Sequence, residues 1–219
     1  MSDEAKAVAD RYARRDVGDR YSPLRPEVMQ MLHERQRALR RLLARHGMTD
    51  PAALDLAEVG CGSGGNLLEL LRLGFAPERL TGLELLPETT RLWLGDATQA
   101  PLAPQSQHIV LQATVFSSLL DDAAQAQLAA AMWRWLRPGG GVLWYDFVYD
   151  NPRNPDVRGV PLARLRQLFP EGRVSFERVT LAPPLARVVC GLHPALYGLF
   201  NALPLLRTHV LAWVGKGSA

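Results

Sequence analysis

The stretch Glu58-Val59-Gly60-Cys61-Gly62-Ser63-Gly64-Gly65-Asn66 decides the fold of this 219-residue chain. The apolar run from Leu54 to Gly60 predicts a buried strand, and the leucine-rich run from Asn66 to Leu73 predicts a helix that ends at Gly74. Glycine is favoured in the turn between them because positive backbone dihedrals cost little without a side chain, and because a ligand can then approach the backbone. A strand, a glycine turn and a helix form one half of a parallel unit.

Alternating strand and helix patterns extend this unit along the chain. Further strands are predicted over Arg79–Leu85, Arg91–Leu94, His108–Ala113, Val142–Phe147, Val174–Leu181 and His209–Val214. The alternation is typical of an α/β fold with a doubly wound, mostly parallel seven-stranded sheet, to which the last two strands add an edge pair.

Helices are predicted from Pro26 to Gly47, from Asp122 to Leu136 and from Pro161 to Phe169. Pro26 suits a first helical turn and Gly47 a C-terminal cap. Asp122 with Gln125 resembles a capping box, and the turn Arg137–Gly141 is predicted to end the second helix and lead into the next strand.

The composition is that of one folded domain with an extension. Hydrophobic residues make up 47% of the chain and charged residues 21%, which excludes a disordered or collagen-like protein. We expect a helical extension or cap over residues 1–50 and a main domain over 51–219, with an apolar insertion or lid at 183–206. Two cysteines are too few for a disulfide framework, and the first residues lack the apolar region of a signal peptide, so a cytoplasmic protein is predicted.

Charge and hydropathy bear on the partners. The first 45 residues hold ten Arg but also seven Asp and Glu, which favours a solvated helix face over a nucleic-acid surface. The stretch from Val188 to Leu206 is uncharged and close to the roughly 20 residues of a membrane span. Because Gly191, Pro194 and Pro204 interrupt it, we expect a lid or a pair of short surface-seeking helices, with peripheral membrane contact through 183–206.

The connection between the second and third strands is too short for a parallel crossover. Parallel neighbours need roughly a dozen connecting residues, and only Leu86–Thr90 are available. Either the third strand is lost or antiparallel, or a helix-length segment is missing between Pro87 and Thr90. We predict the missing segment.

The spacing of an acidic residue points to a nucleoside cofactor. Glu84 lies 24 positions after Gly60, close to the spacing of about 20 for a carboxylate that binds ribose hydroxyls. Gly60, Gly62 and Gly65 also satisfy the dinucleotide pattern G-x-G-x-x-G, so an NAD(P)-dependent oxidoreductase stays open at this point.

Four motifs together resemble the class I S-adenosylmethionine-dependent methyltransferases, of the type 11/12 kind. They are Glu58–Gly64, Gly82-Leu83-Glu84, Gly95-Asp96-Ala97 and Leu136-Arg137-Pro138-Gly139-Gly140, in the family's order over roughly Leu54 to Phe147. The resemblance implies S-adenosylmethionine as cofactor and no metal. It also implies these cofactor contacts: Glu58, Gly60, Cys61, Gly62, Gly64 and Asn66 with the methionine part, Glu84 and Leu85 with ribose, Asp96 and Ala97 with the adenine edge, and Gln112 and Ala113 beneath the methionine.

The acceptor is expected beside the fifth strand. The stretch Tyr145–Gly159 is rich in Asp, Asn, Tyr and Arg and leaves the carboxyl end of that strand, where ligands bind in open parallel sheets. Asp146, Tyr149 and His193 are candidates for a catalytic base or orienting group. The candidate substrate contacts are Tyr12, Tyr21, Asn151, Arg153, Asn154 and Arg158.

We therefore expect O-methylation of a small or lipid-linked molecule, such as a sugar or glycan precursor or a secondary metabolite, by a monomer or homodimer that binds no nucleic acid. The segment after the fourth strand lacks the Asn/Asp-Pro-Pro-aromatic tetrapeptide and the Pro-Cys pair that resembling enzymes use on nucleic-acid bases. The alternatives are an NAD(P)-dependent oxidoreductase, an RNA methyltransferase and a non-catalytic S-adenosylmethionine-binding protein.

Overall fold

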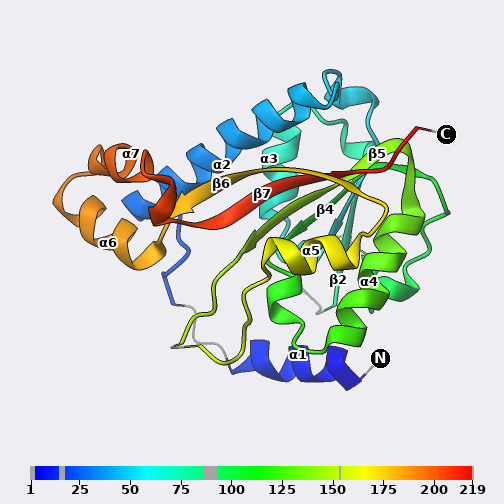
Figure 1. Cartoon of the computed structure of the whole chain (residues 1–219), viewed down its shortest axis with the longest axis horizontal. Helices are drawn as coiled ribbons and strands as arrows, with labels where there is room; N and C mark the ends of the chain where they lie inside the picture. Colours follow the sequence, from blue (N-terminus) through cyan, green and yellow to red (C-terminus); the bar gives the residue numbers. More distant parts are fainter. Residues whose placement is uncertain (1–2, 15–17, 86–92, 153, 219) are drawn as a thin grey trace.

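The computed structural model describes residues 3–14, 18–85, 93–152 and 154–218. These residues form one seven-stranded sheet in the order β3-β2-β1-β4-β5-β7-β6 (Figure 1). The strands are β1 (Leu56–Val59), β2 (Leu80–Glu84), β3 (Trp93–Leu94), β4 (Gln107–Ala113), β5 (Leu136–Phe147), β6 (Arg173–Leu181) and β7 (Arg207–Gly215). Strands β1 to β5 pair in parallel, and β7 lies antiparallel between β5 and β6. The predicted doubly wound sheet with its edge pair is confirmed.

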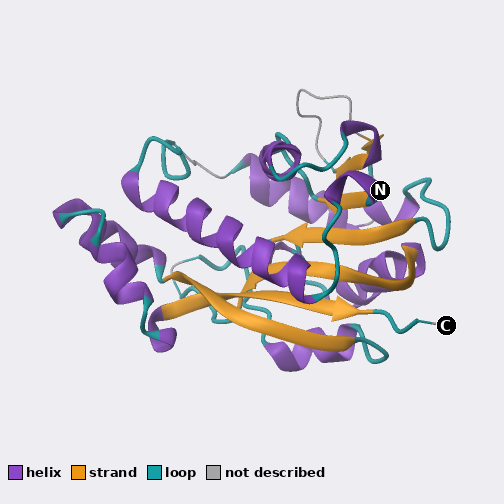
Figure 2. Cartoon of the chain, turned by 90° about the horizontal axis from the view of Figure 1, so that it is seen from above, coloured by secondary structure: helices purple, strands orange, loops and turns teal. Residues whose placement is uncertain are grey.

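Helices cover both faces of the sheet (Figure 2). They are α1 (Asp3–Ala13), α2 (Pro26–Arg45), α3 (Gly65–Arg72), α4 (Asp122–Trp135), α5 (Leu162–Leu168), α6 (Pro183–Leu192) and α7 (Leu196–Asn201). In β5, Val142 and Trp144 belong to the core that α4 and α5 cover, while Leu143 and Tyr145 belong to the core that α2 and α3 cover. A strand buried on both faces needs a continuous apolar run, which is what this stretch of β5 has.

The N-terminal extension shares the core of the sheet. Ala38, Leu42 and Leu43 of α2 are buried in the same cluster as Leu143. Pro26 stands in the first turn of α2, as predicted, and Gly47 follows its end with a φ of +71°. The extension therefore packs against the main domain through α2.

The third strand is present and parallel to the second. Leu83 pairs with Trp93 and Glu84 with Leu94, so a lost or antiparallel third strand is excluded. The missing segment that we predict between Pro87 and Thr90 falls at residues 86–92, which lie outside the described residues.

One predicted cap and one predicted strand boundary were wrong. Helix α4 is capped by Asp121, whose side chain accepts from the Ala124 N–H at 2.6 Å, and not by Asp122. Strand β5 begins at Leu136, directly after α4, instead of after a separate turn. Its glycines allow this because a Cβ at Gly140 would lie 2.6 Å from the His108 carbonyl oxygen.

Helices α6 and α7 follow β6 and precede β7 in the sequence, and they form a small lobe. Leu181, Ala186, Val189, Cys190 and Tyr197 make its own buried cluster. The lobe projects beyond the edge of the sheet, at the left of Figure 1. Among the residues that the structure describes, no helix has the length and apolar character needed to cross a membrane.

Candidate active site

The glycine loop lies between β1 and α3. Gly60, Gly62 and Gly64 all have positive φ angles, of +65°, +51° and +83°. A Cβ at Gly60 would lie 2.4 Å from a methyl of Val115, so the absence of a side chain also lets the segment after β4 approach the loop. At Gly64 and Gly65 a Cβ would meet nothing within 4 Å. The loop is thus packed at its first glycine and open at its last two.

Glu58 at the end of β1 is fully buried. Its Oε1 accepts a hydrogen bond from Asn66 Nδ2 at 2.6 Å, and Asn66 Oδ1 accepts one from Arg35 Nη2 at 2.6 Å. Its Oε2 is buried without a hydrogen-bond partner among the described residues. Burial raises the pKa of this carboxyl to about 7. Helix α2 therefore reaches the glycine loop through Arg35, which sequence reasoning missed.

Glu84 ends the neighbouring strand and faces the loop. Its Oε2 accepts from the Gly62 N–H at 2.7 Å and its Oε1 from the Leu85 N–H at 2.8 Å. The Gly60 and Cys61 N–H groups both donate to the Leu83 carbonyl oxygen. The ends of β1 and β2 are therefore joined through the backbone as well as through a carboxylate.

The other predicted cofactor contacts lie at the same edge. Gln112 is buried and pairs in register with Val59, and its side chain accepts from the Val115 N–H at 3.1 Å. Asp96 precedes Ala97 in a turn after β3, and its carboxylate accepts from the backbone and hydroxyl of Thr98. The sheet thus brings the predicted set together at the carboxyl ends of β1 to β4. The set includes Ala113 and the buried Cys61.

Asp146 is buried at the end of β5. Its carboxylate accepts from the Ser117 N–H at 3.2 Å and from the Phe147 N–H at 3.0 Å. Burial raises the pKa of this carboxyl to about 7. In this geometry the side chain holds the turn after β4 in place and faces no open space.

Tyr149 and the loop after it are tied mainly to the protein itself. The Tyr149 hydroxyl accepts from Arg178 at 2.7 Å, and the Arg178 guanidinium lies 5.5 Å from the centre of the tyrosine ring. Asn154 accepts from the Asp156 N–H, and Arg158 pairs with Asp122 on α4. The Asn151 carbonyl oxygen accepts from the Asn154 N–H. Arg153 lies outside the described residues.

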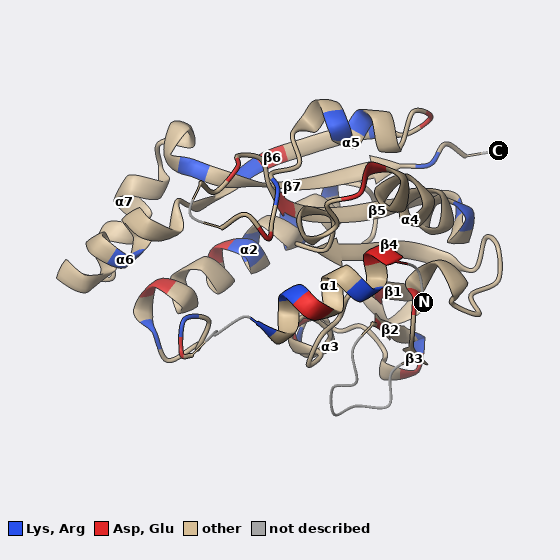
Figure 3. Ribbon diagram, turned by 90° about the horizontal axis from the view of Figure 1, so that it is seen from below, with Lys and Arg blue, Asp and Glu red and all other residues tan. Residues whose placement is uncertain are grey.

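His193 is exposed in the connection between α6 and α7, where its Nδ1 accepts from the Ala195 N–H at 3.2 Å. The lobe extends away from β1 and α3 in two views (Figures 1 and 3). The structure therefore does not bring His193 to the glycine loop.

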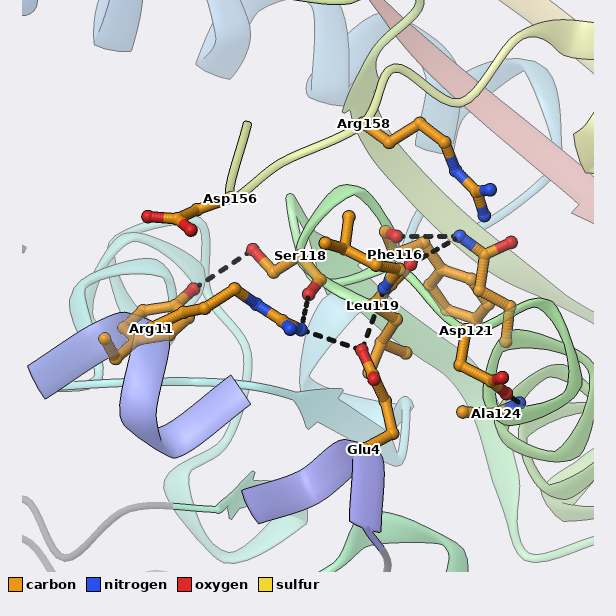
Figure 4. Close-up of polar contacts among 12 residues, drawn as sticks. Glu4, Arg11, Phe116, Ser118, Leu119, Asp121, Ala124, Asp156 and Arg158 are labelled. Carbon is orange, nitrogen blue, oxygen red and sulfur yellow. Dashed lines mark hydrogen bonds and ion pairs between the residues drawn. The ribbon is translucent and has the colours of Figure 1, made fainter. Parts of the chain in front are cut away.

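Helix α1 lies over the segment that follows β4 (Figure 4). Glu4 Oε1 accepts from Arg11 at 2.7 Å and from the Leu120 N–H at 2.8 Å, and Arg11 also donates to the Ser118 carbonyl oxygen at 2.9 Å. The Tyr12 hydroxyl is 3.4 Å from Ser118 Oγ. Tyr21, between α1 and α2, is exposed. Of the two predicted N-terminal tyrosines, the structure places Tyr12 at this edge of the sheet.

A mostly apolar pocket opens beside Asn66. Arg35, Asn66, Ala113 and Tyr145 line it together with leucines of α2, α3 and the sheet. It therefore adjoins the Glu58–Asn66 pair on the face of the sheet that α2 and α3 cover.

Comparison with known proteins assigns the class. Residues 57–144, from β1 into β5, match a family model described as a methyltransferase domain. No curated protein sequence matches the chain significantly.

Solved structures share the fold at low sequence identity. Geranyl diphosphate C-methyltransferase from Streptomyces coelicolor A3(2), in complex with Mg²⁺, geranyl diphosphate and S-adenosyl-L-homocysteine, gives a TM-score of 0.65 at 14% identity, over 100% of this chain and 99% of that one. The 1,6-didemethyltoxoflavin-N1-methyltransferase of Burkholderia thailandensis was also solved with bound S-adenosylhomocysteine. It gives a TM-score of 0.61 at 17% identity, over 98% of this chain and 87% of that one. An S-adenosylmethionine-dependent methyltransferase from Archaeoglobus fulgidus gives a TM-score of 0.56 at 13% identity, over 83% of this chain and 94% of that one.

The methyltransferase match over residues 57–144 and the strand order agree with the class I S-adenosylmethionine-dependent methyltransferase that the sequence motifs predict. S-Adenosylmethionine is accordingly its cofactor. The oxidoreductase that the glycine pattern left open receives no support from these matches.

Proposed function

We propose that the cofactor lies across the carboxyl ends of β1, β2 and β4, with its amino-acid part on the glycine loop. The observation that carries this proposal is Glu58 Oε2, a buried acceptor without a hydrogen-bond partner in the described structure. The cofactor has an ammonium group, which is the donor that such an oxygen needs, and a carboxylate, which the free N–H groups at the start of α3 favour. The open space at Gly64 and Gly65 leaves room for both.

Glu84 is proposed to bind the ribose hydroxyls. It ends β2 beside the glycine loop, and its carboxylate, which accepts from the backbone of Gly62 and Leu85, is the type of group that binds paired hydroxyls. The remaining proposed contacts are those of Asp96 and Ala97 with the adenine edge, and of Gly60, Cys61, Asn66, Gln112 and Ala113 with the methionine part.

The cofactor supplies an activated methyl group on a positively charged sulfonium. The residues around the site hold the acceptor atom in line with it and exclude water, and such orientation contributes roughly 7 to 11 kcal/mol. For a hydroxyl acceptor, Tyr149 is the proposed base or orienting group, because its ring is half exposed and its oxygen is held by Arg178. Asp146 is proposed to orient the turn at Ser117, and the place of His193 in the lobe disfavours a catalytic role.

We infer an acceptor that is small or lipid-linked and that is methylated on oxygen. The polar loop from Tyr149 to Arg158 supports a hydroxylated group, and the proposed contacts of that group are Asn151, Arg153, Asn154, Arg158, Tyr12 and Tyr21. An RNA acceptor is disfavoured because acidic and basic residues alternate along α1 and around the start of α2 (Figure 3). A cytoplasmic monomer or homodimer stays the prediction from the sequence.

The α6–α7 lobe supports a lipid surface as the source of the acceptor. Leu192, Leu199 and Leu205 are 77%, 67% and 93% exposed. The 19 residues from Val188 to Leu206 contain no acidic side chain, and Arg187 and Arg207 border them. Exposed apolar side chains between cations match the apolar and anionic layers of a membrane surface.

Calorimetry with S-adenosylmethionine, S-adenosylhomocysteine and NAD tests the cofactor site. The wild type should bind the first two only, and Glu84→Ala should lose at least about tenfold in affinity, or about 1.4 kcal/mol. Glu78→Ala is the matched control, because Glu78 is exposed just before the other end of the same strand and should leave binding unchanged. Comparable affinity for NAD, or unchanged binding by Glu84→Ala, would overturn the proposal.

Transfer from cofactor carrying a carbon-13 methyl group tests the acceptor. Products from glycolipids and lipid-linked sugars should show the carbon chemical shift of a methyl ether, which differs from that of a methyl on nitrogen or carbon. Labelling on nitrogen or carbon alone would remove the O-methylation assignment while leaving the cofactor site untouched.

A further inference from the structure

Arg35 is a half-buried cation on the inward side of α2. It shares that side with Ala38 and Leu42, three and seven positions further on, which are both fully buried. Its guanidinium lies 5.2 Å from the centre of the Tyr145 ring and donates to Asn66 Oδ1 at 2.6 Å. Holding a charged side chain against the core in this way is costly, which calls for a reason beyond packing.

The hydrogen bond from Arg35 decides which way the Asn66 amide points. A guanidinium only donates, so it selects the amide oxygen and leaves the amide NH₂ directed at Glu58. With the amide reversed, its oxygen would face Glu58 Oε1 and two acceptors would repel. Arg35 therefore keeps Oε1 of Glu58 satisfied by Asn66, and leaves Oε2 as the oxygen available to a ligand.

The charges that face Glu58 come from two elements. Arg35 of α2 favours the ionised carboxyl, and Glu84 of β2 disfavours it. Burial has the largest effect, and the result is a pKa of about 7. Removing Arg35 would raise the pKa of Glu58 further, because the positive charge that favours the ionised carboxyl would be lost. Burial and Glu84, which both raise this pKa, would remain.

We propose that Arg35 is a positioning residue for the cofactor: it acts through the Asn66 amide to present a free, ionised oxygen of Glu58 to the ammonium group of the cofactor's amino-acid part. This inference rests on the proposed placement of that part on the glycine loop. It assigns to α2 a role in the affinity for the amino-acid part of the cofactor and none in recognition of the nucleoside.

Calorimetry with two ligands separates these parts. S-Adenosylhomocysteine carries the amino-acid part, and 5′-methylthioadenosine carries the same nucleoside and sulfur without it. Arg35→Gln should weaken binding of S-adenosylhomocysteine about tenfold near pH 7 and change binding of 5′-methylthioadenosine by less than about twofold. Arg37→Gln, an exposed arginine on the same helix, should change neither.

The pH dependence and a double-mutant cycle test the route of the effect. In Arg35→Gln the pH at which S-adenosylhomocysteine binding is half-maximal should move upward, and Arg35→Lys, which keeps the charge, should return it toward the wild-type value. In an Asn66→Ala background, Arg35→Gln should cause a clearly smaller loss, because only the direct effect of its charge on the pKa of Glu58 is then removed.

Three other results would contradict either this role of Arg35 or the proposed placement of the cofactor. A full tenfold loss in the Asn66→Ala background would mean that Arg35 touches the ligand directly, and would overturn the inference. An equal loss for both ligands, or an unshifted pH profile, would mean a structural role only. Binding of 5′-methylthioadenosine without any preference for S-adenosylhomocysteine in the wild type would instead overturn the proposed placement of the amino-acid part.

Discussion

Glu58 is the residue at which stability and ligand binding oppose each other. Its folded-state pKa of about 7 lies above the ordinary value of 4.5, so the folded protein binds the proton more tightly than the unfolded chain does. The stability that this preference contributes is complete below the ordinary value and is lost as the pH rises through about 7. At about pH 8 the buried charge costs on the order of 3 kcal/mol, the free energy that corresponds to a pKa raised from 4.5 to about 7.

Glu58→Gln should therefore stabilise the ligand-free protein and weaken cofactor binding. The amide oxygen keeps the hydrogen bond from Asn66, while the charge that the ammonium group needs is removed. Thermal unfolding at about pH 8 should show a midpoint several degrees higher than the wild type, at about 2 to 4 °C per kcal/mol, and the gain should shrink at about pH 5. S-Adenosylhomocysteine affinity should fall more than about tenfold. A variant less stable than the wild type at about pH 8 would contradict this account.

Sequence reasoning found the residues at strand ends more readily than their partners. Glu84 follows from its distance to the glycine loop, and Glu58 from the family resemblance of the motif that contains it. Arg35 gave no such signal, because it is one of ten arginines in the first 45 residues and its contact depends on how α2 crosses α3. The position of Asp146 at the end of a strand predicts a catalytic base or orienting group. The sequence does not reveal that its carboxylate accepts hydrogen bonds from two backbone N–H groups.

At the scale of elements, α1 and the segment after β4 are held together by one small polar cluster. Glu4 and Arg11 are seven residues apart, so they share one side of α1, and both side chains are only slightly exposed. Between them they satisfy the Ser118 carbonyl and the Leu120 N–H. Loss of either side chain leaves a partly buried backbone group unpaired, which costs about 1 to 3 kcal/mol.

Arg11→Ala should loosen α1 and the segment beneath it. Hydrogen exchange should rise at the amides of residues 118–120 and along α1, while exchange at β1 and β4 stays slow. Arg14→Ala is the matched control, because Arg14 is 65% exposed at the side chain and its ion-pair partner Asp156 is 3.8 Å away. Unchanged exchange at Leu120 in Arg11→Ala would show that α1 is held by other contacts.

The order of the strands and helices could be predicted from the sequence, whereas the residues at which they begin and end could be predicted less well. Strand and helix alternation predicted the seven strands because most of the apolar runs have a glycine or proline turn at one or both ends. The cap of α4 was misassigned by one residue, since Asp121 and Asp122 are equivalent in sequence and only the backbone geometry separates them. Gln125 resembled half of a capping box, yet its amide donates to the Phe116 and Leu119 carbonyls instead.

At the scale of the whole molecule, the α6–α7 lobe is a fixed projection. Glu34 of α2 is buried and accepts from the Tyr197 hydroxyl at 2.6 Å, from Asn201 at 2.8 Å and from the Thr180 N–H at 3.0 Å. A lobe held in this way exposes its outer leucines because of its position and not because of loose packing. The predicted lid at 183–206 stays a prediction, whereas the exposed apolar surface of the lobe is observed.

The lobe should bring the protein to anionic membranes. The full-length protein should co-sediment with vesicles of phosphatidylglycerol and phosphatidylcholine, more weakly with phosphatidylcholine alone, and Leu192→Ser with Leu205→Ser should reduce the bound fraction several-fold. Each apolar side chain that leaves water contributes about 1.5 to 3 kcal/mol at most. Leu71→Ser, at an exposed leucine of α3, is the control. Sedimentation unaffected by the paired change, or a dimer that the paired change abolishes in light scattering, would assign the lobe another partner.

The lobe leaves the sheet and returns to it at a single point. The Ala182 N–H donates to the Leu206 carbonyl oxygen at 2.8 Å, so the two ends of the intervening segment are already neighbours across β6 and β7. The two chain ends therefore meet where the pairing of β6 with β7 ends, so the register of these strands does not fix the length of the segment between them.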